Sequence, residues 1–177
     1  MKILKHKAQN IKWFIMDVDG VLTDGKIIYD SRMNELKNFN VKDGLGISLL
    51  HKSGIKTAVI TGRNSDMVKR RAQELKISEV LQNADNKLKI YRYLKKKYGF
   101  NDEEALYIGD DYNDLPVLKA VHFPVTVPSA PDLVKKECIY VTKRDGGDGA
   151  VRETAELILN LQGKLEKVVE EFLRYGD

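Results

Sequence analysis

The stretch IKWFIMDVDGVLTDG, residues 11–25, is a short apolar run that breaks off into carboxylates and glycines. This pattern is typical of a buried parallel strand that ends at a cleft. Asp17 and Asp19 are two residues apart, so on an extended strand their side chains point the same way. Two carboxylates held this close repel each other unless a cation lies between them. The stretch therefore indicates a metal-dependent site at the end of a central strand.

The length fits a single domain spanning residues 1–177, because a chain of this size can bury its own core. The one cysteine, Cys138, excludes a disulfide within the chain, and no cluster of Cys and His indicates zinc or an iron–sulfur centre. No apolar run reaches the length of a membrane span. We therefore expect a cytoplasmic protein with no membrane partner.

The charge balance points to a small anionic ligand. Lysine and arginine total 30 against 26 aspartates and glutamates, a formal net charge of +4. An excess of basic residues can indicate nucleic-acid binding, but here they are mixed with acids, as in KKKYGFNDEE at 95–104. We therefore expect no nucleic-acid partner. A modest positive balance around an acidic metal site suits a small anionic substrate.

Strand-like and helix-like runs alternate along the chain. Strands are predicted within 11–18, 55–61, 79–82, 105–108, 123–127 and 138–142, and helices within 41–54, 65–77, 86–100, 131–136, 146–162 and 163–176. Such alternation predicts a parallel sheet with helices on both faces, a Rossmann-like three-layer α/β sandwich. In these sheets the ligand lies at the carboxyl ends of the strands. Asp17-Val18-Asp19, Thr61-Gly62-Arg63 and Gly109-Asp110-Asp111 should therefore converge.

A β-hairpin is predicted directly after the carboxylate strand, within residues 25–40. Its strand-like runs are 26–29 and 35–39, joined by the turn-forming DSRMN at 30–34. A two-stranded ribbon alone is marginal in water and has unpaired edges. We therefore expect the chain to self-associate through residues 26–39.

The converging residues predict phosphoryl chemistry. Asp17, Asp19 and either Asp110 or Asp111 supply hard oxygen ligands, which suit Mg²⁺. Mg²⁺ is usually held by one or two carboxylates together with a substrate phosphate. Asp17 can then attack phosphorus as a nucleophile, and Asp19 can serve as the general acid and base.

Two further residues would bind the transferred group. Thr61 offers a hydroxyl and a backbone N–H to the phosphoryl oxygens, and Lys87 offers a positive charge. Each motif alone has a plain structural alternative: the aspartates as turn residues, Thr61 as the cap of the next helix, Lys87 as a surface lysine. The order and spacing of the motifs together favour the catalytic interpretation.

These residues carry a resemblance. Asp17-Val18-Asp19-Gly20, Thr61-Gly62-Arg63, Lys87 and Gly109-Asp110-Asp111 with Asp114 are similar to the four motifs of the haloacid-dehalogenase superfamily of phosphatases. That family implies a Rossmann-like fold, an aspartate nucleophile and Mg²⁺. The presence of both Asp17 and Asp19 resembles the phosphatase branch, and the chain is too short for a large cap domain. A capless enzyme is expected.

The resemblance extends nearly end to end. DVDGVLTDG, FNVKDGLGI, AVITGR, IGDDYND and GGDGAVRE are similar to the 3-deoxy-D-manno-octulosonate 8-phosphate phosphatase family, which makes a sugar-acid precursor of lipopolysaccharide. The resemblance implies a homotetramer in which hairpins roof neighbouring active sites. It implies that Asp17, Asp110 and the backbone carbonyl of Asp19 hold Mg²⁺, that Asp19 is the acid and base, and that Thr61 and Lys87 bind the phosphoryl group.

The same resemblance implies a set of substrate-binding positions. They are Asp19, Asn40, Val41, Lys42, Asp43, Gly44, Ser48, Arg63, Arg71, Lys87 and Asp111. For Asp43 helix capping is the alternative, and for Lys42 and Arg71 it is a surface position. Ser48 and Asp148 depart from the basic residues expected at those positions, and Arg152 lies either near the site or in an ion pair.

Three questions stay open at this stage. The substrate could be another small sugar phosphate, given Ser48 and Asp148. The chain could instead be a non-catalytic tetramerising module, like the one appended to sialic-acid-activating synthetases. The C-terminal segment 163–177 could be a packed helix or an arm that closes a neighbouring site.

Overall fold

A computed structural model describes residues 2–174, and its centre is one parallel sheet with the strand order β5-β4-β1-β6-β7-β8. The strands are β1 (Trp13–Met16), β4 (Lys56–Ile60), β5 (Glu79–Leu81), β6 (Ala105–Ile108), β7 (Phe123–Thr126) and β8 (Tyr140–Val141). Every pairing between neighbouring strands is parallel. The predicted parallel α/β sheet is confirmed.

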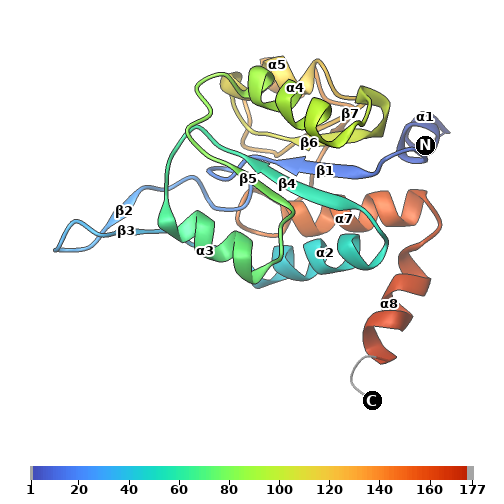
Figure 1. Cartoon of the computed structure of the whole chain (residues 1–177), viewed down its shortest axis with the longest axis horizontal. Coiled ribbons are helices and arrows are strands. Elements are labelled where there is room, and N and C mark those ends of the chain that lie inside the picture. The colour runs from blue at the N-terminus through green and yellow to red at the C-terminus, as the bar shows by residue number, and fades with distance from the viewer. Residues whose placement is uncertain (1, 175–177) are drawn as a thin grey trace.

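Helices form the two outer layers. One face is covered by α4 (Lys87–Tyr98) and α5 (Leu115–Leu118), and the other by α2 (Val41–Lys52), α3 (Asp66–Glu74) and α7 (Ala150–Leu161), as Figure 1 shows. The other helical segments are α1 (Lys2–Ala8), η1 (Asp102–Glu104), η2 (Tyr112–Asp114), α6 (Asp132–Lys135) and α8 (Leu165–Leu173). The three predicted layers are therefore present.

Strand β1 determines where the site lies. All four of its side chains are buried, as expected for a central parallel strand that reads as a continuous apolar run. Met16 is in register with Val59 of β4 on one side and with Ile108 of β6 on the other. The chain runs from β1 outward through β4 and β5 and then crosses back to β6. The order reverses beside β1, so the carboxyl ends of β1 and β6 flank the topological switch point.

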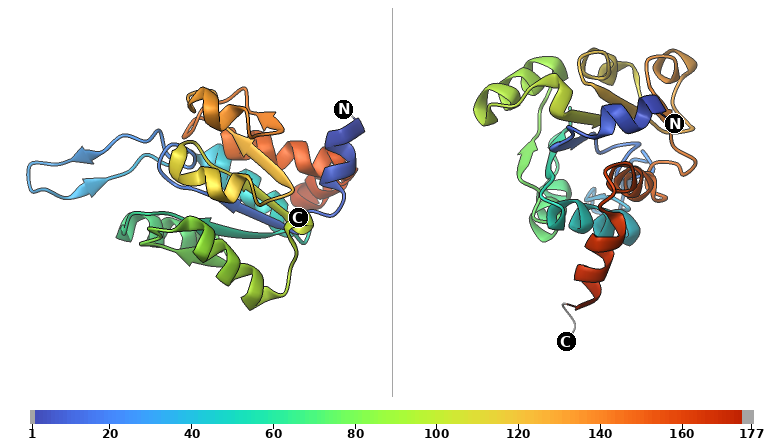
Figure 2. Two further views of the ribbon diagram at one scale, coloured as in Figure 1. Left: turned by 90° about the horizontal axis from the view of Figure 1, so that it is seen from above. Right: turned by 90° about the vertical axis from the view of Figure 1, so that its right-hand side faces the viewer.

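The hairpin is a separate two-stranded sheet that projects from the body of the molecule (Figures 1 and 2). Its strands, β2 (Ile28–Tyr29) and β3 (Glu35–Leu36), are shorter than the predicted runs. Pairing ends at Leu36, and the side chain of the next residue, Lys37, donates to Asp19. The carboxylate of Asp30 closes the turn by accepting the backbone N–H groups of residues 32 and 34, both at 2.8 Å.

The two chain ends add helices outside the sandwich. Helix α1 was not indicated by the sequence pattern; its Ala8 is buried, and the side chain of Gln162 donates to the Ala8 carbonyl at 2.8 Å. Helix α8 leads away from the body (Figure 2) but buries Val168. Of the predicted segment 163–177, residues 175–177 lie outside the described part of the chain. Within residues 2–174 no helix combines the length and apolar character needed to cross a membrane.

Asp43 connects two helices of one layer. Its side chain is buried, and Oδ1 accepts the backbone N–H of Arg152 at the start of α7, at 2.8 Å. Burial raises the pKa of Asp43 to about 6, against the lowering effect of backbone N–H groups in the first turn of α7. The carboxylate of α2 thus occupies the N-terminus of α7, where the unpaired N–H groups and the helix dipole favour an anion.

Replacing this carboxylate should destabilise the fold. We expect Asp43→Ala to lower the free energy of unfolding by about 1–3 kcal/mol, because a buried helix end loses its acceptor. Urea unfolding followed by circular dichroism measures the change. Asp132→Ala, at the start of α6 and exposed, is the matched control and should change the free energy by less than about 0.5 kcal/mol. Equal effects of the two substitutions would contradict the capping role.

Candidate active site

The predicted catalytic side chains meet in one cleft at the carboxyl ends of β1, β4 and β6. This cleft has a volume of about 220 Å³ and is lined by Asp17, Asp19, Thr61, Gly62, Arg63, Lys87, Asp110, Asp111 and Asn113. Each of the three polar strand ends contributes to it. The predicted convergence is therefore present, and only Asn113 and the glycine were not among the expected site residues.

Asp17 and Lys87 form the buried floor of the cleft. Asp17 directly follows β1, and its backbone N–H donates to the carbonyl of Ile108 at 3.0 Å, which continues the pairing of β1 with β6. Lys87 is the first residue of α4, whose N-cap Asn86 accepts the N–H of Lys89. The ammonium of Lys87 lies 2.9 Å from Asp17 Oδ1, and both side chains are almost fully buried. Lys87 is therefore not the surface lysine of the alternative interpretation.

Asp114 has a larger part in the site than the sequence suggested. Its buried carboxylate accepts from Lys87 Nζ at 2.6 Å and from the Tyr107 hydroxyl at 2.5 Å. It also accepts the backbone N–H groups of Asp110 and Asp111, at 3.0 and 3.3 Å. These four donors use the acceptor capacity of the carboxylate. Asp114 therefore holds the loop after β6 and orients Lys87.

Some signal for this network exists in the sequence. Asp111 and Asp114 form a capping box around η2, a pattern readable from their spacing. Tyr107 is the one residue with a hydroxyl in the otherwise aliphatic run of β6. The distance between Tyr107 and Asp114 in space could not be read from either pattern.

The acidic cluster fits a hard divalent cation. Carboxylate oxygens of Asp17, Asp110 and Asp114 all lie within 4.8 Å of one another. Burial, with the nearby Asp114 charge, raises the pKa of Asp17 to about 7. Burial, with the charges of Asp17 and Asp114, raises the pKa of Asp110 to about 8. Because Asp114 is already saturated, Asp17 and Asp110 are the two side chains left to bind a metal such as Mg²⁺.

The backbone comes unusually close to this cluster at Gly20. This glycine has a φ of +92°, and a Cβ atom on it would lie 2.0 Å from Asp110 Oδ2. Behind it, a Cβ atom on Gly146 would lie 1.9 Å from the Gly20 carbonyl oxygen. Only glycine permits both the conformation and the approach. The loop after Asp19 is thus pressed between the acidic cluster and the segment that precedes α7.

Thr61 and Arg63 follow β4. Thr61 is buried and does not cap the next helix, since the N-cap of α3 is Ser65. This excludes the capping alternative for Thr61. Its hydroxyl stays close to the loop by accepting the N–H of Arg63 at 3.4 Å. The side chain of Thr61 is therefore available at the wall of the cleft.

Most of the other predicted substrate positions lie outside this cleft. Asp19, Arg63, Lys87 and Asp111 line it, whereas Asn40, Val41, Lys42, Asp43, Gly44, Ser48 and Arg71 do not. Asn40 caps α2, and Ser48 donates to the Gly44 carbonyl within the same helix. Arg71 lines a separate cavity of about 200 Å³ that also includes Lys37 and Phe39. The substrate roles of these seven residues stay predictions.

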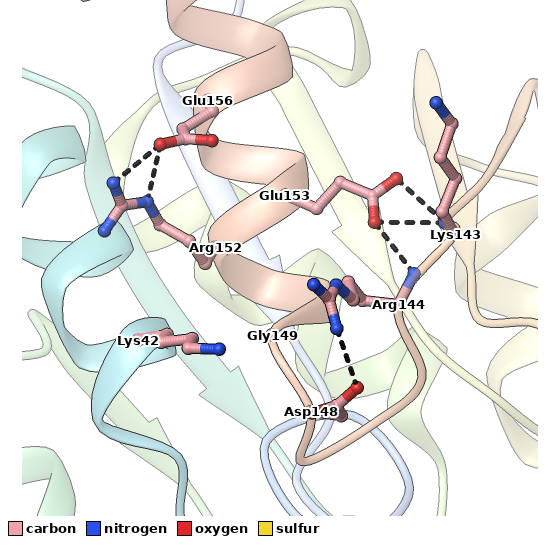
Figure 3. Close-up of a pocket in the computed structure, with 8 residues that line it drawn as sticks. All are labelled: Lys42, Lys143, Arg144, Asp148, Gly149, Arg152, Glu153 and Glu156. Atoms are coloured by element: carbon pink, nitrogen blue, oxygen red, sulfur yellow. Dashed lines mark hydrogen bonds and ion pairs between the residues drawn. The ribbon is translucent and has the colours of Figure 1, made fainter.

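A second and larger cavity, of about 550 Å³, lies between α2 and α7. Figure 3 shows its lining residues, Lys42, Lys143, Arg144, Asp148, Gly149, Arg152, Glu153 and Glu156. Most of the charges drawn there are paired: Arg144 with Asp148 at 3.4 Å and Arg152 with Glu156 at 2.6 Å. The ion-pair alternative for Arg152 is confirmed. This cavity is larger than the cleft and includes the predicted substrate position Lys42, but it contains none of the predicted catalytic or metal-binding residues.

Comparison with known proteins identifies relatives along most of the chain. Residues 41–122 match a family model described as haloacid dehalogenase-like hydrolase. The chain is 44% identical over 161 residues to 3-deoxy-D-manno-octulosonate 8-phosphate phosphatase KdsC of Escherichia coli K12, covering 91% of this chain and 86% of the relative.

Solved structures agree with this similarity. The 3-deoxy-D-manno-octulosonate 8-phosphate phosphatase of Moraxella catarrhalis, crystallised with magnesium ion, phosphate ion and KDO, has a TM-score of 0.94 and 45% identity, covering 97% of this chain and 99% of its own. The cobalt-bound enzyme of Haemophilus influenzae has a TM-score of 0.86 and 42% identity, covering 90% and 93%.

Magnesium affinity should depend on pH. Because Asp17 and Asp110 have raised pKa values of about 7 and about 8, protons compete with the metal at neutral pH. We expect Mg²⁺ to bind at least about tenfold more tightly at pH 8 than at pH 6. Calorimetric titration of the metal-free protein measures this. Asp110→Asn should weaken binding and flatten the pH dependence, and equal affinity at both pH values would contradict the role of these carboxylates.

Proposed function

This chain belongs to the 3-deoxy-D-manno-octulosonate 8-phosphate phosphatases of the haloacid dehalogenase-like hydrolases, and we propose that it catalyses their reaction. Its substrate would be 3-deoxy-D-manno-octulosonate 8-phosphate, and its products the free sugar acid and phosphate, in lipopolysaccharide precursor synthesis. The observation that carries the proposal is the single cleft in which Asp17 and Asp19 meet Lys87, Thr61 and Asp110. The whole chain would be one catalytic domain without a cap domain.

The first half of the reaction transfers the phosphoryl group to the protein. A carboxylate oxygen of Asp17 attacks phosphorus, and the bond between phosphorus and the sugar oxygen breaks. Asp19 gives its proton to that oxygen, so the sugar leaves as an alcohol. Lys87, held between Asp17 and Asp114, orients the nucleophile and places a positive charge beside the transferred group.

The second half restores the enzyme. Asp19, now a carboxylate, takes a proton from a water molecule while the water oxygen attacks the phosphorus of the aspartyl-phosphate. The bond from phosphorus to Asp17 breaks, which releases phosphate and regenerates the carboxylate. Thr61 would hold the phosphoryl oxygens during both halves.

Magnesium fits this scheme. Asp17, Asp110 and the backbone carbonyl of Asp19 would hold the ion, and the raised pKa values of the two carboxylates are consistent with a site suited to a cation. Bound Mg²⁺ would neutralise charge on the phosphoryl oxygens and so favour attack by an anionic nucleophile.

Another small sugar phosphate is the alternative substrate. Ser48 brings no positive charge, and its hydroxyl is used within α2. Asp148 brings a negative charge that pairs with Arg144. Both observations bear on how the sugar acid is recognised and leave the phosphatase chemistry untouched.

A cytoplasmic location stays a prediction from the sequence.

We also propose that the protein is a homotetramer assembled through the hairpin at residues 26–39. The projecting ribbon exposes apolar side chains, namely Ile27, Tyr29, Met33 and Leu36, of which Met33 is 74% exposed. Exposed apolar side chains on a short ribbon favour burial against another surface. Neighbouring subunits would then complete the walls of the open cleft, which would bring the remaining predicted substrate positions into use.

Activity tests the proposed function directly. With Mg²⁺, the protein should release phosphate from 3-deoxy-D-manno-octulosonate 8-phosphate with a higher kcat/KM than from other sugar phosphates. Asp17→Asn should lower kcat at least about 10³-fold, because the amide is not a nucleophile. A clear preference for a different ester would establish the alternative substrate. Full activity of the Asp17→Asn protein would contradict Asp17 as the nucleophile, and no turnover by the wild type would leave the tetramerising module as the explanation.

The assembly has its own test. Ile27→Asp combined with Leu36→Asp should shift the molar mass measured by light scattering from that of a tetramer toward smaller species, because charges on the apolar ribbon oppose its burial. Ile3→Asp, at an exposed apolar residue of α1, is the control and should leave the mass unchanged. A monomeric wild-type protein would refute the proposed tetramer.

A further inference from the structure

Lys37 is buried although it belongs to the projecting hairpin. Its side chain is only 1% exposed, and its ammonium lies 2.5 Å from Asp19 Oδ1 and 3.5 Å from Glu35 Oε1. A buried ammonium is costly unless it is paired, so the two carboxylates account for its position. The hairpin therefore contributes a charged contact to the side chain that moves protons in the proposed reaction.

Strand geometry explains why this lysine faces the site. Glu35 and Lys37 are two residues apart in an extended segment, so both side chains point to one side of the ribbon, and Leu36 points to the other. Leu36 is correspondingly exposed, and it pairs across the ribbon with Ile28. Ile28 and Leu36 therefore share one face of the ribbon, and Tyr29, which pairs with Glu35, shares the face of Glu35 and Lys37 that turns toward Asp19.

A cluster of two cations and two carboxylates results. Arg63 donates from Nη2 to Glu35 Oε1 at 2.8 Å, and its Nε lies 3.9 Å from Asp19 Oδ2. Asp19 Oδ1 receives Lys37 at 2.5 Å and, more weakly, the Thr23 hydroxyl at 3.5 Å. Oδ1 of Asp19 is therefore held by Lys37 and Thr23, whereas Oδ2 makes only the longer contact with Arg63.

Lys37 does not line the catalytic cleft. It lines a separate cavity with Phe39, Met67 and Arg71, and Asp19 does not line that cavity. Asp19 itself is 25% exposed and lines the cleft. The ammonium of Lys37 contacts Asp19 and does not reach the cleft, so its effect on the reaction passes through that carboxyl group.

We propose that Lys37 is a positioning residue, which holds Asp19 Oδ1 so that Oδ2 is presented to the leaving oxygen of the substrate. Glu35 completes the device by fixing Lys37 and Arg63 relative to each other. In the reaction Oδ2 gives its proton to the leaving oxygen while the bond from that oxygen to phosphorus breaks. A general acid that is free to rotate loses much of its benefit, which is about 10²–10⁴-fold for a well-placed group.

This inference rests on the proposed function, and leaving-group dependence tests it. A sugar alkoxide needs a proton to leave, whereas p-nitrophenolate leaves as the anion. We expect Lys37→Met to lower kcat/KM at least about 30-fold for 3-deoxy-D-manno-octulosonate 8-phosphate and less than about threefold for p-nitrophenyl phosphate. Lys37→Arg, which keeps a cationic donor, should recover most of the loss.

Lys12→Met is the matched control. Lys12 also lies 2.5 Å from a carboxylate, that of Glu104, but its side chain is exposed and near the amino end of β1. This substitution should change neither kcat/KM. A double-mutant cycle adds a second check, because Lys37→Met should have almost no further effect on the sugar phosphate once Asp19→Asn is in place.

A structural readout is independent of turnover. A crystal structure of the Lys37→Met protein should show the Asp19 carboxyl group in a changed or multiple rotamer, with the loop of residues 20–25 unaltered. If Lys37→Met does not fold, Glu35→Gln replaces it and should show the same selective loss, since it removes one of the two partners of Lys37.

The outcomes separate the two proposals. An equal loss for both substrates, an unchanged Asp19 rotamer, or full additivity with Asp19→Asn would each overturn the positioning role and leave the phosphatase function standing. A wild-type protein that hydrolyses none of these phosphate esters would overturn the proposed function itself.

Discussion

One ammonium group between two buried carboxylates holds the site together. Lys87 lies 2.9 Å from Asp17 and 2.6 Å from Asp114, and all three side chains are almost fully withdrawn from water. Breaking such a pair by removing one member leaves an uncompensated buried charge. Asp114 in turn binds the backbone of the loop after β6. The orientation of the nucleophile, the path of that loop and the start of α4 are thus set by the same contacts.

The two aspartates that end β1 lie in different environments, although they are two residues apart. Asp17 is buried, and its pKa is raised to about 7 by burial and by Asp114. Asp19 is a quarter exposed and is held by a cation from the hairpin. A buried carboxylate beside Lys87 suits nucleophilic attack, and a partly exposed one beside the cleft suits proton exchange with an alcohol or water. Strand alternation puts both in the cleft, and their surroundings divide the work.

The strand ends and Lys87 could be predicted because their order along the chain and the geometry of parallel sheets are enough to bring them together. The network around Asp114 and the burial of Lys37 could not be predicted, because they depend on how closely segments that are distant in the sequence approach each other in space. Lys37, the residue after β3, has the sequence context of any solvated hairpin residue, and strand alternation predicts which face it lies on but not how deeply it is buried. Asp43 shows the same limit: its spacing predicts a cap, but the helix it serves is α7, which begins more than a hundred positions later.

The close packing of Gly20 has a consequence for turnover. A backbone pressed on one side against Asp110 and on the other against Gly146 has no free volume in which to pivot. The segment that joins β1 to the hairpin therefore acts as a rigid connection rather than a hinge. Enzymes with mobile lids often wait for the lid to open before product leaves. Here the exchange of substrate and product would be governed by diffusion through a permanently shaped entrance, and selectivity by the outline of that entrance.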